Sequence, residues 1–355
     1  MTQTKYRNTG ITDTKEQARR ISKVIRYAEQ KLRGRFSILK HQNALGMTIF
    51  TSSALAMVAV TFLYAYSIIP GWSAIVLNGI FASFLHELEH DLIHSLYFKG
   101  QWQEKLMMWG VWMFRGATIS PFYRKEIHLH HHKVSGQKDD IEEQMLGNGS
   151  KFGLLRIEGW LDSNLSFLIY AKKVKKTSPS FDPIAMVKGA FPFQTIFTVS
   201  GIIFLAYQAM TLASYTMGFT IPESLQPIGP VINFMGVVYL VPNAIQRICL
   251  HFVTTNMHYF GDIKPGRAGL VQQTQILKPW YFLPFHLFCF NFGSTHGIHH
   301  FVANQPFYIR LMIAKTAHAA MIKYGVRYND VANIFRANRY EMKPKAVAQS
   351  VTQVA

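Results

Sequence analysis

Two long stretches of this 355-residue chain contain almost no charged side chains. Residues 41–86 have no Asp, Glu, Lys or Arg, and residues 189–246 have Glu223 as their sole charge. A membrane-spanning helix needs roughly 20 apolar residues, so each stretch is long enough for two spans and a tight turn. We therefore expect two helical hairpins within a membrane.

The turns divide each stretch into two expected spans. In the first hairpin these are residues 45–66 and 72–88, separated by a turn at 68–71. In the second they are residues 193–215 and 231–248, and the turn at 220–230 contains three prolines. The alternative is a large soluble protein with buried helices. Charged residues make up only 16% of the chain, where soluble domains have roughly 25%, and this argues against that alternative.

The basic residues cluster outside these stretches. Residues 1–40 form a basic N-terminal segment with eleven Lys or Arg. Residues 41–310 are the expected membrane domain, and residues 311–355 a C-terminal segment with a frayed tail at 343–355. Cytoplasmic loops carry the excess of Lys and Arg, so we expect both termini and the central loop in the cytoplasm. The net charge of +18 is then a belt facing anionic lipid, and we expect no nucleic-acid partner, since the charge follows the span ends.

Twelve of the 15 histidines lie in four short segments at or beyond the ends of the expected spans. The segments contain His86, His90 and His94; His128, His130, His131 and His132; His251 and His258; and His296, His299 and His300.

The spacing of these histidines predicts shared helix faces. His86 and His90 are four residues apart and therefore point to the same side of a helix. His130 is two positions from His128 and faces away, so we exclude it. His94 lies about 80° around the helix from His86 and is a weaker candidate. The second and fourth segments each place three histidines at i, i+3 and i+4: His128, His131 and His132, and His296, His299 and His300.

So many imidazoles on one side of a membrane predict a metal centre. A single histidine is more often an ordinary polar side chain, but two HxxHH clusters and an HxxxH pair are poorly explained by chance. They exceed what one four-coordinate zinc takes and suit two metals. Imidazole accepts zinc, copper, iron and nickel, so the ligand type alone does not choose the element.

The chain carries, in this order, the motifs HxxxH, HxxHH and a late HxxHH, together with two apolar hairpins. In this pattern it resembles the membrane fatty-acid desaturase/hydroxylase superfamily. The resemblance covers roughly residues 45–310. It implies an all-α, polytopic membrane protein in which four transmembrane helices form two hairpins and a cytoplasmic helical cap holds two irons. It also implies an enzyme that uses O₂ and two electrons to oxidise an unactivated C–H bond of a fatty acyl chain.

The resemblance also implies a set of metal ligands. It supplies a ligand between the second and third boxes, which His258 in the run Asn256-Met257-His258-Tyr259 matches. His251 and Asn256 are weaker candidates for a further ligand. The expected ligands are His86, His90, His128, His131, His132, His258, His296, His299 and His300.

Acidic residues surround these histidines in the sequence and suggest a supporting role. Carboxylates can accept hydrogen bonds from the outer N–H groups of metal-binding imidazoles. A solvated acidic surface is the alternative, and the sequence alone leaves both open. The residues concerned are Glu87, Glu89, Asp91, Asp139, Asp140, Glu142 and Glu143.

The sequence constrains the product of the reaction less than it constrains the metal centre. A fatty acid desaturase is the first interpretation, because the run HGIHH and the residues after it are desaturase-like. The runs HELEHD and NMHYFGD are closer to alkane hydroxylases, and the compact chain also resembles bacterial decarboxylases that convert free medium-chain fatty acids to 1-alkenes. Hydroxylation and oxidative decarboxylation are therefore alternatives.

Two other classes of function fit part of the pattern. His86-Glu87-x-x-His90 also matches HExxH, the zinc-protease helix in which the glutamate is the general base. Such an intramembrane protease has no use for two further HxxHH clusters. A metal transporter would place its ligands near the middle of the membrane, whereas these histidines lie at or beyond the span ends.

Nothing in the chain predicts a built-in source of electrons. It has no Gly-rich dinucleotide fingerprint after a strand, and its two cysteines are too few for an iron–sulfur cluster. We therefore expect an external donor, such as a ferredoxin, rubredoxin or cytochrome with its NAD(P)H reductase. Arg124, Lys125, Lys133 and Lys138 lie near the second histidine box and would attract an acidic carrier.

Overall fold

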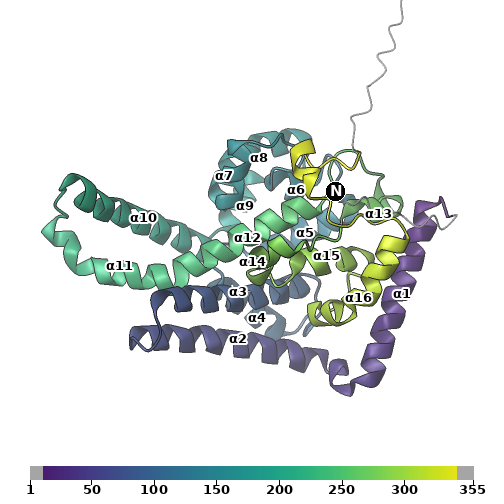
Figure 1. Ribbon diagram of the computed structural model, residues 1–355, viewed down its shortest axis with the longest axis horizontal. Coiled ribbons are helices and arrows are strands. Elements are labelled where there is room, and N and C mark those ends of the chain that lie inside the picture. Colours follow the sequence, from purple (N-terminus) through teal and green to yellow (C-terminus); the bar gives the residue numbers. More distant parts are fainter. Residues whose placement is uncertain (1–10, 342–355) are drawn as a thin grey trace, which may run out of the picture.

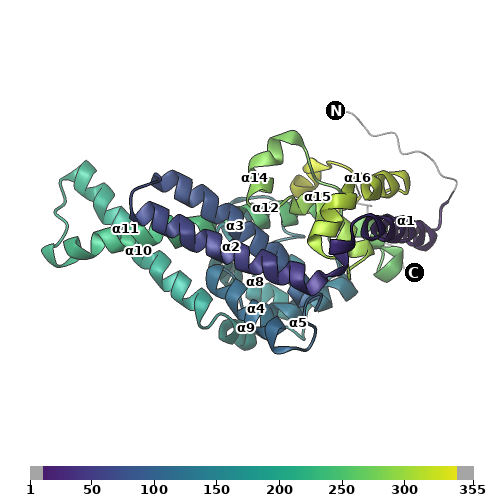
Figure 2. The same cartoon turned by 90° about the horizontal axis from the view of Figure 1, so that it is seen from below.

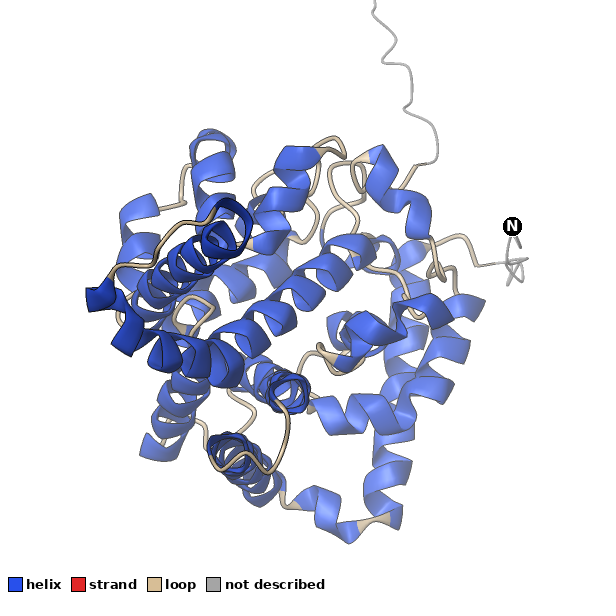
Figure 3. Cartoon of the chain, turned by 60° about the vertical axis from the view of Figure 1, so that its left-hand side comes forward, coloured by secondary structure: helices blue, strands red, loops and turns tan. Residues whose placement is uncertain are grey.

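The computed structural model describes residues 11–341, and within this range the chain is helical without a β-strand (Figures 1 and 3). Two isolated β-bridges, His258 with Thr274 and Ile276 with Tyr328, are the only extended pairings in the described part. The predicted frayed tail at 343–355 lies outside the described residues.

The helices occur in the following order along the chain. They are α1 (Thr14–Arg35), η1 (Ser37–Lys40), α2 (Gln42–Ala65), α3 (Gly71–Ile93), α4 (Trp102–Phe114), α5 (Pro121–Val134), α6 (Ile141–Met145), α7 (Leu154–Leu161), α8 (Ser163–Thr177), α9 (Pro183–Gly189), α10 (Phe193–Met217), η2 (Glu223–Ile228), α11 (Gly229–Met235), η3 (Gly236–Leu240), α12 (Val241–Met257), η4 (Gly266–Ala268), α13 (Leu270–Gln273), η5 (Trp280–Phe282), α14 (Leu283–Leu287), α15 (Phe292–Phe301), α16 (Phe307–Lys323) and η6 (Val331–Arg336).

Two antiparallel hairpins project from the same side of a helical cap (Figures 1 and 2). One consists of α2 and α3, and the other of α10 with the continuous run α11–η3–α12. Three helices are long and apolar enough to cross a membrane: Gln42–Ala65, Phe193–Met217 and Glu223–Met257. These coincide with three of the four expected spans. The fourth expected span forms as α3, which does not meet the same criterion because its buried C-terminal half carries histidines and carboxylates.

The hairpins expose apolar side chains on their outer surfaces. Leu55 and Phe62 on α2 and Ile202 and Leu205 on α10 are all more than half exposed. Soluble proteins rarely present apolar surface this extensive, because water disfavours it. A lipid bilayer removes that cost, and the chain is therefore an integral membrane protein.

A single π-helical turn, η3, interrupts the long second-hairpin helix. Pro242 follows it and has no N–H, so a carbonyl one turn earlier loses its usual partner. The side-chain amide of Asn78 on α3 donates to the carbonyl of Val238 over 2.9 Å. The amide of Asn243 donates to the Tyr239 carbonyl over 3.0 Å. Such replacement partners are required where no water is available, and the Asn78–Val238 bond joins the two hairpins.

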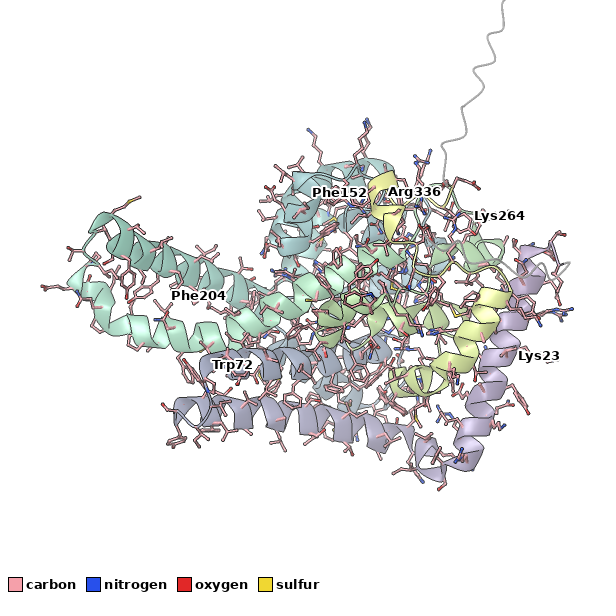
Figure 4. The ribbon with its side chains drawn as sticks, in the orientation of Figure 1. Lys23, Trp72, Phe152, Phe204, Lys264 and Arg336 are labelled. Atoms are coloured by element: carbon pink, nitrogen blue, oxygen red, sulfur yellow. The ribbon has the colours of Figure 1, made fainter. Side chains whose placement is uncertain are left out.

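The cap is closed by elements from both ends of the chain. Helix α1 packs along α16, and their apolar faces share one core that includes Ile21, Ile25, Ile313 and Met321. Helix α1 is therefore part of the cap rather than an independent arm. Figure 4 shows Lys23 of α1 on the side of the molecule opposite to Trp72 and Phe204 of the hairpins.

We predict that Asn78→Leu destabilises the hairpin pair. The Val238 carbonyl would be buried without a donor, which costs about 1–3 kcal/mol. Thermal unfolding of the purified protein in nanodiscs should show a lower midpoint. Thr211→Val is the matched control, because the Thr211 hydroxyl donates to the Tyr207 carbonyl within its own helix. Equal midpoints for Asn78→Leu and the control would contradict this role for Asn78.

Candidate metal centre

Four segments that are distant in sequence deliver histidines to one buried place in the cap. The C-terminal half of α3 is fully buried and supplies the first set. Helix α5 supplies the second and begins with Pro121 behind the cap residue Ser120, whose hydroxyl accepts from the Phe122 amide. His258 directly follows α12 in an extended conformation, with φ −96° and ψ 147°. Helix α15 supplies the last set.

The histidines form two adjacent groups. Within each group the candidate ligand nitrogens all lie within 4.8 Å of one another. The first group is His90, His94, His128, His132 and His299, and the second is His131, His258, His296 and His300.

The Nε2 atoms of each group face one another at short range. In the first group the Nε2 of His299 lies 3.0 Å from that of His94 and 2.9 Å from that of His132. In the second the Nε2 of His300 lies 3.1 Å from that of His296 and 3.4 Å from that of His258. Two nitrogens bound at right angles to one metal, with bonds of about 2.1 Å, are about 3.0 Å apart. The residues therefore fit two metal ions.

Unpartnered nitrogens lead to the same conclusion. Both ring nitrogens of His90 and the Nδ1 of His296 are buried without a hydrogen-bond partner. An unsatisfied buried polar group costs about 1–3 kcal/mol, and a metal would remove that cost for the nitrogen it binds. Burial lowers the pKa of His296, His299 and His300 well below the usual histidine range. Neutral imidazole is the form that binds metals.

Outer hydrogen bonds orient four of the rings. An acceptor at Nδ1 keeps the ring proton there and leaves the Nε2 lone pair for a metal. The pairs are His128 with Glu142 at 2.7 Å, His131 with Asp140 at 2.9 Å, His258 with the Thr254 carbonyl at 2.8 Å, and His300 with the Gln273 side-chain oxygen at 3.1 Å.

Asp140 is the most firmly held of these partners. It caps α6, where its carboxylate accepts from the backbone N–H groups of Gly136 at 2.8 Å and Glu143 at 3.2 Å. Burial opposes the imidazolium form of His131, but the charge and hydrogen bond of Asp140 outweigh it and raise the pKa of His131 to about 10. Metal binding at the Nε2 of His131 would therefore release a proton.

Three carboxylates on α3 pair mainly with arginines rather than with ligand histidines. Arg310 of α16 lies 3.0 Å from Glu87 and 3.2 Å from Asp91, and all three side chains are fully buried. Glu89 pairs with Arg115 and with Arg124. The sequence suggests that Glu87, Glu89 and Asp91 accept hydrogen bonds from metal-binding imidazoles. In the structure these carboxylates neutralise arginines instead.

Arg310 also reaches the metal centre directly. Its Nη1 donates to the Nδ1 of His299 over 3.0 Å and to the carbonyl of Gln305 over 3.0 Å. Guanidinium has no acceptor, so the Nδ1 of His299 must accept this bond.

The structure assembles most of the expected ligands but exchanges one. His94 belongs to the first group, whereas His86 belongs to neither. The two ring nitrogens of His86 are buried without a partner, and its ring lies 5.3 Å from that of Phe292. His86 and His94 are each four residues from His90, and the folded chain decides between them, because the ring of His94 lies 4.9 Å from that of His132 and 4.4 Å from that of His299.

The remaining candidates stand outside both groups. His130 is partly exposed and lies 3.2 Å from the Asp139 carbonyl, as its predicted orientation requires. The Nδ1 of His251 donates to the Trp160 carbonyl over 3.2 Å. The Asn256 amide donates to the Phe252 carbonyl of its own helix over 2.8 Å.

A cavity of about 140 Å³ borders the histidines on the side toward the hairpins. His128, His131, His258 and His296 line its inner end, so it touches both groups. Its walls are largely apolar. They include Ile119, Ile127, Ile141, Met145, Leu146, Met186, Leu250 and Phe292, interspersed with Thr118, Arg124, Glu142, Glu143, Ser163, Ser166, Gln194, His251 and Thr254. A chain of methylene groups suits such walls.

Comparison with known proteins identifies the family. A family sequence model described as "Fatty acid desaturase" matches residues 66–332, which is most of the chain. The chain belongs to the fatty acid desaturase family. The match begins at the end of α2 and includes every histidine of the two groups. Family membership makes the protein an oxidoreductase of the desaturase/hydroxylase type. A search of curated proteins gives no match.

We predict that His94→Ala and His86→Ala differ in metal content. His94→Ala should lose bound iron, with a loss of affinity above the roughly 10–100-fold caused by removing a ligand's hydrogen-bond partner. His86→Ala should retain most of its iron. The measurement is iron per chain by elemental analysis of purified protein.

His130→Ala is the control for these two variants, because His130 lies outside both groups, and it should retain wild-type iron. A His86→Ala protein as poor in iron as His94→Ala would show that His86 is a ligand.

Proposed function

We propose that this protein is a membrane-bound diiron oxidoreductase that uses O₂ and two electrons to oxidise a C–H bond of a fatty acyl chain, as a fatty acid desaturase. Its substrate is a fatty acid or fatty acyl group. The observation that supports this proposal most strongly is the contact between both histidine groups and one apolar cavity. An oxidising centre and a chain of methylene groups would meet there.

The protein residues have distinct roles in this proposal. Two irons, when bound, would supply the O₂ chemistry that an unactivated C–H bond requires. The nine histidines of the two groups would hold them. Asp140, Glu142 and Gln273 orient the rings through their outer nitrogens. The apolar cavity walls exclude water and align the chain beside the histidines.

The protease interpretation has less support. In a zinc protease the glutamate of HExxH must reach a metal-bound water. Here Glu87 is fully buried and lies 3.0 Å from Arg310. His86, the first histidine of that motif, lies outside both groups of candidate ligands. Two irons per chain would support the oxidase, and one zinc would support the protease.

We also propose that α3 is the fourth span and that both termini and the metal centre face the cytoplasm. The hairpin tips contain no Lys or Arg, whereas the cap contains nearly all basic residues, as expected for cytoplasmic segments. Packing against α2 and α12 would compensate for the lower hydropathy of α3, because its polar C-terminal half is buried within the protein.

An external electron donor completes the proposed reaction. Lys133 and Lys138 are exposed near the second histidine box and would attract an acidic carrier such as a ferredoxin, rubredoxin or cytochrome. Arg124 and Lys125 are less suited to this role, since they pair with Glu89 and Glu104.

The product and the donor can be tested together. Iron-loaded protein in nanodiscs, given O₂ and a medium-chain fatty acid, should be inactive with NADPH alone and active once a ferredoxin and its reductase are added. Mass spectrometry should detect an unsaturated acid of unchanged chain length. A 1-alkene one carbon shorter, or a hydroxylated product, would instead support decarboxylation or hydroxylation. Sustained turnover with NADPH alone would contradict the external donor.

Membrane topology has a separate test. Reporter fusions after Arg35, at Lys138 and after Arg339 should all report the cytoplasm, because basic residues surround these positions. Fusions at Pro70 and Glu223, at the hairpin tips, should report the opposite side. A cytoplasmic signal at Pro70 would rule out α3 as a complete span.

A further inference from the structure

The outer end of the cavity is formed by segments that adjoin the base of the second hairpin. Ser163 of α8, Met186 of α9 and Ile119 before α5 line the cavity and are each partly exposed. Arg124, Ile127, Glu142, Leu146 and His251 also line the cavity and are partly exposed, but Ser163, Met186 and Ile119 are the lining residues that lie on or beside α8 and α9. Gln194, in the first turn of α10, also lines it.

Hydrogen bonds hold this outer end at the level where the membrane helices begin. The Asn164 amide of α8 donates to the Thr198 hydroxyl of α10 over 3.0 Å, within two turns of the start of that span. Arg247 of α12 donates to the Leu161 carbonyl over 2.6 Å. The Ser120 amide donates to the Gly189 carbonyl over 2.9 Å. The first two of these bonds tie α8 and the end of α7 to spanning helices, and the third ties α9 to the start of α5.

The surface around the opening is apolar and continues onto the spans. Leu165 and Leu168 on α8 and Ile184 on α9 are exposed, Leu168 at 75% and Ile184 at 67%. Phe191 and Ile196 extend this surface onto α10 and are also more than half exposed. Exposed lysines follow the leucines on α8 and end α9: Lys172, Lys173, Lys175, Lys176 and Lys188. Apolar side chains bordered by lysines are typical of segments that lie in the headgroup region of an anionic bilayer.

One polar group at the opening has no partner in the protein. The side chain of Gln194 is 6% exposed, and its Oε1 is buried without a hydrogen bond. Such a group is costly at the start of an apolar span. The protonated carboxyl group of a fatty acid passing from the headgroup region into the cavity would donate to this oxygen and supply the missing partner.

We propose that the cavity opens into the bilayer between α8, α9 and α10, and that the substrate enters from the membrane as a long-chain amphiphile dissolved in it. This inference rests on the proposed function, and it specifies the substrate class as a membrane-dissolved fatty acid rather than an acyl group on a water-soluble carrier. The occupant of the apolar surface on α8 and α9 is the lipid bilayer.

Lipid contact is tested with nitroxide labels in nanodiscs containing anionic lipid. Single cysteines replace Leu168 or Ile184 in a background that lacks the buried Cys249 and Cys289. Tyr27→Cys is the control, because Tyr27 is 68% exposed and belongs to α1, the helix at the end of the cap away from the hairpins (Figure 1). Labels at positions 168 and 184 should collide more with oxygen than with a water-soluble nickel chelate, and the label at position 27 should show the reverse. Nickel accessibility equal to position 27, or shielding from both reagents by another protein copy, would overturn the bilayer contact.

The opening is tested by obstruction. Met186→Trp should slow the uptake of cis-parinaric acid by iron-free protein in nanodiscs by about tenfold. Val187→Trp is the matched control on the same helix, because Val187 is exposed and does not line the cavity; it should bind at the wild-type rate. Met186→Phe gives a milder obstruction if the tryptophan variant fails to fold, and should slow uptake in the same direction.

The uptake result is independent of the oxidation chemistry, because it uses iron-free protein and no turnover. Wild-type uptake by folded Met186→Trp and Met186→Phe would overturn the proposed opening and leave the diiron function standing. Slowed uptake in a protein that oxidises no fatty acid would support the opening and reject the proposed function.

Discussion

In both histidine groups, Nε2 atoms face one another across about 3 Å, and the packing of the cap holds the rings in this arrangement. Neutral imidazoles in this arrangement gain little from each other without metal. Buried acceptors behind the rings, above all Asp140, therefore have to fix the orientation. Asp140 in turn depends on backbone N–H groups of the α5–α6 connection. Preorganisation of this kind lowers the cost of metal binding.

The second constraint is the absence of water around the hairpins. Pro242 would leave a carbonyl unpaired inside the apolar region, and Asn78 supplies the donor from the other hairpin. The same contact fixes how α3 lies against the second hairpin. Since α3 carries His90 and His94 at its cap end, a hydrogen bond within the hairpins also positions the first histidine group.

Much of this architecture follows from the sequence, because hydropathy and histidine spacing are local signals. The three long apolar helices and the two helices that carry HxxHH could be predicted from these local signals. The sequence does not choose between His86 and His94, because HxxxH occurs twice, as His86–His90 and His90–His94, and only the folded chain groups His94 with the other histidines. Arg310 gives no signal at all, since one arginine in a chain with 37 basic residues looks like surface charge. Its partners on α3 are more than 200 residues away, and only folding brings them together.

Arg310 also has a consequence for biosynthesis. Helix α3 is made early, with Glu87 and Asp91 on its buried face, whereas α16 lies near the end of the chain. Until α16 docks, these two carboxylates lack their guanidinium partner and His299 lacks the donor at its Nδ1. The surroundings of the histidine groups are therefore complete only once α16 has been translated, after every segment that supplies a histidine to them.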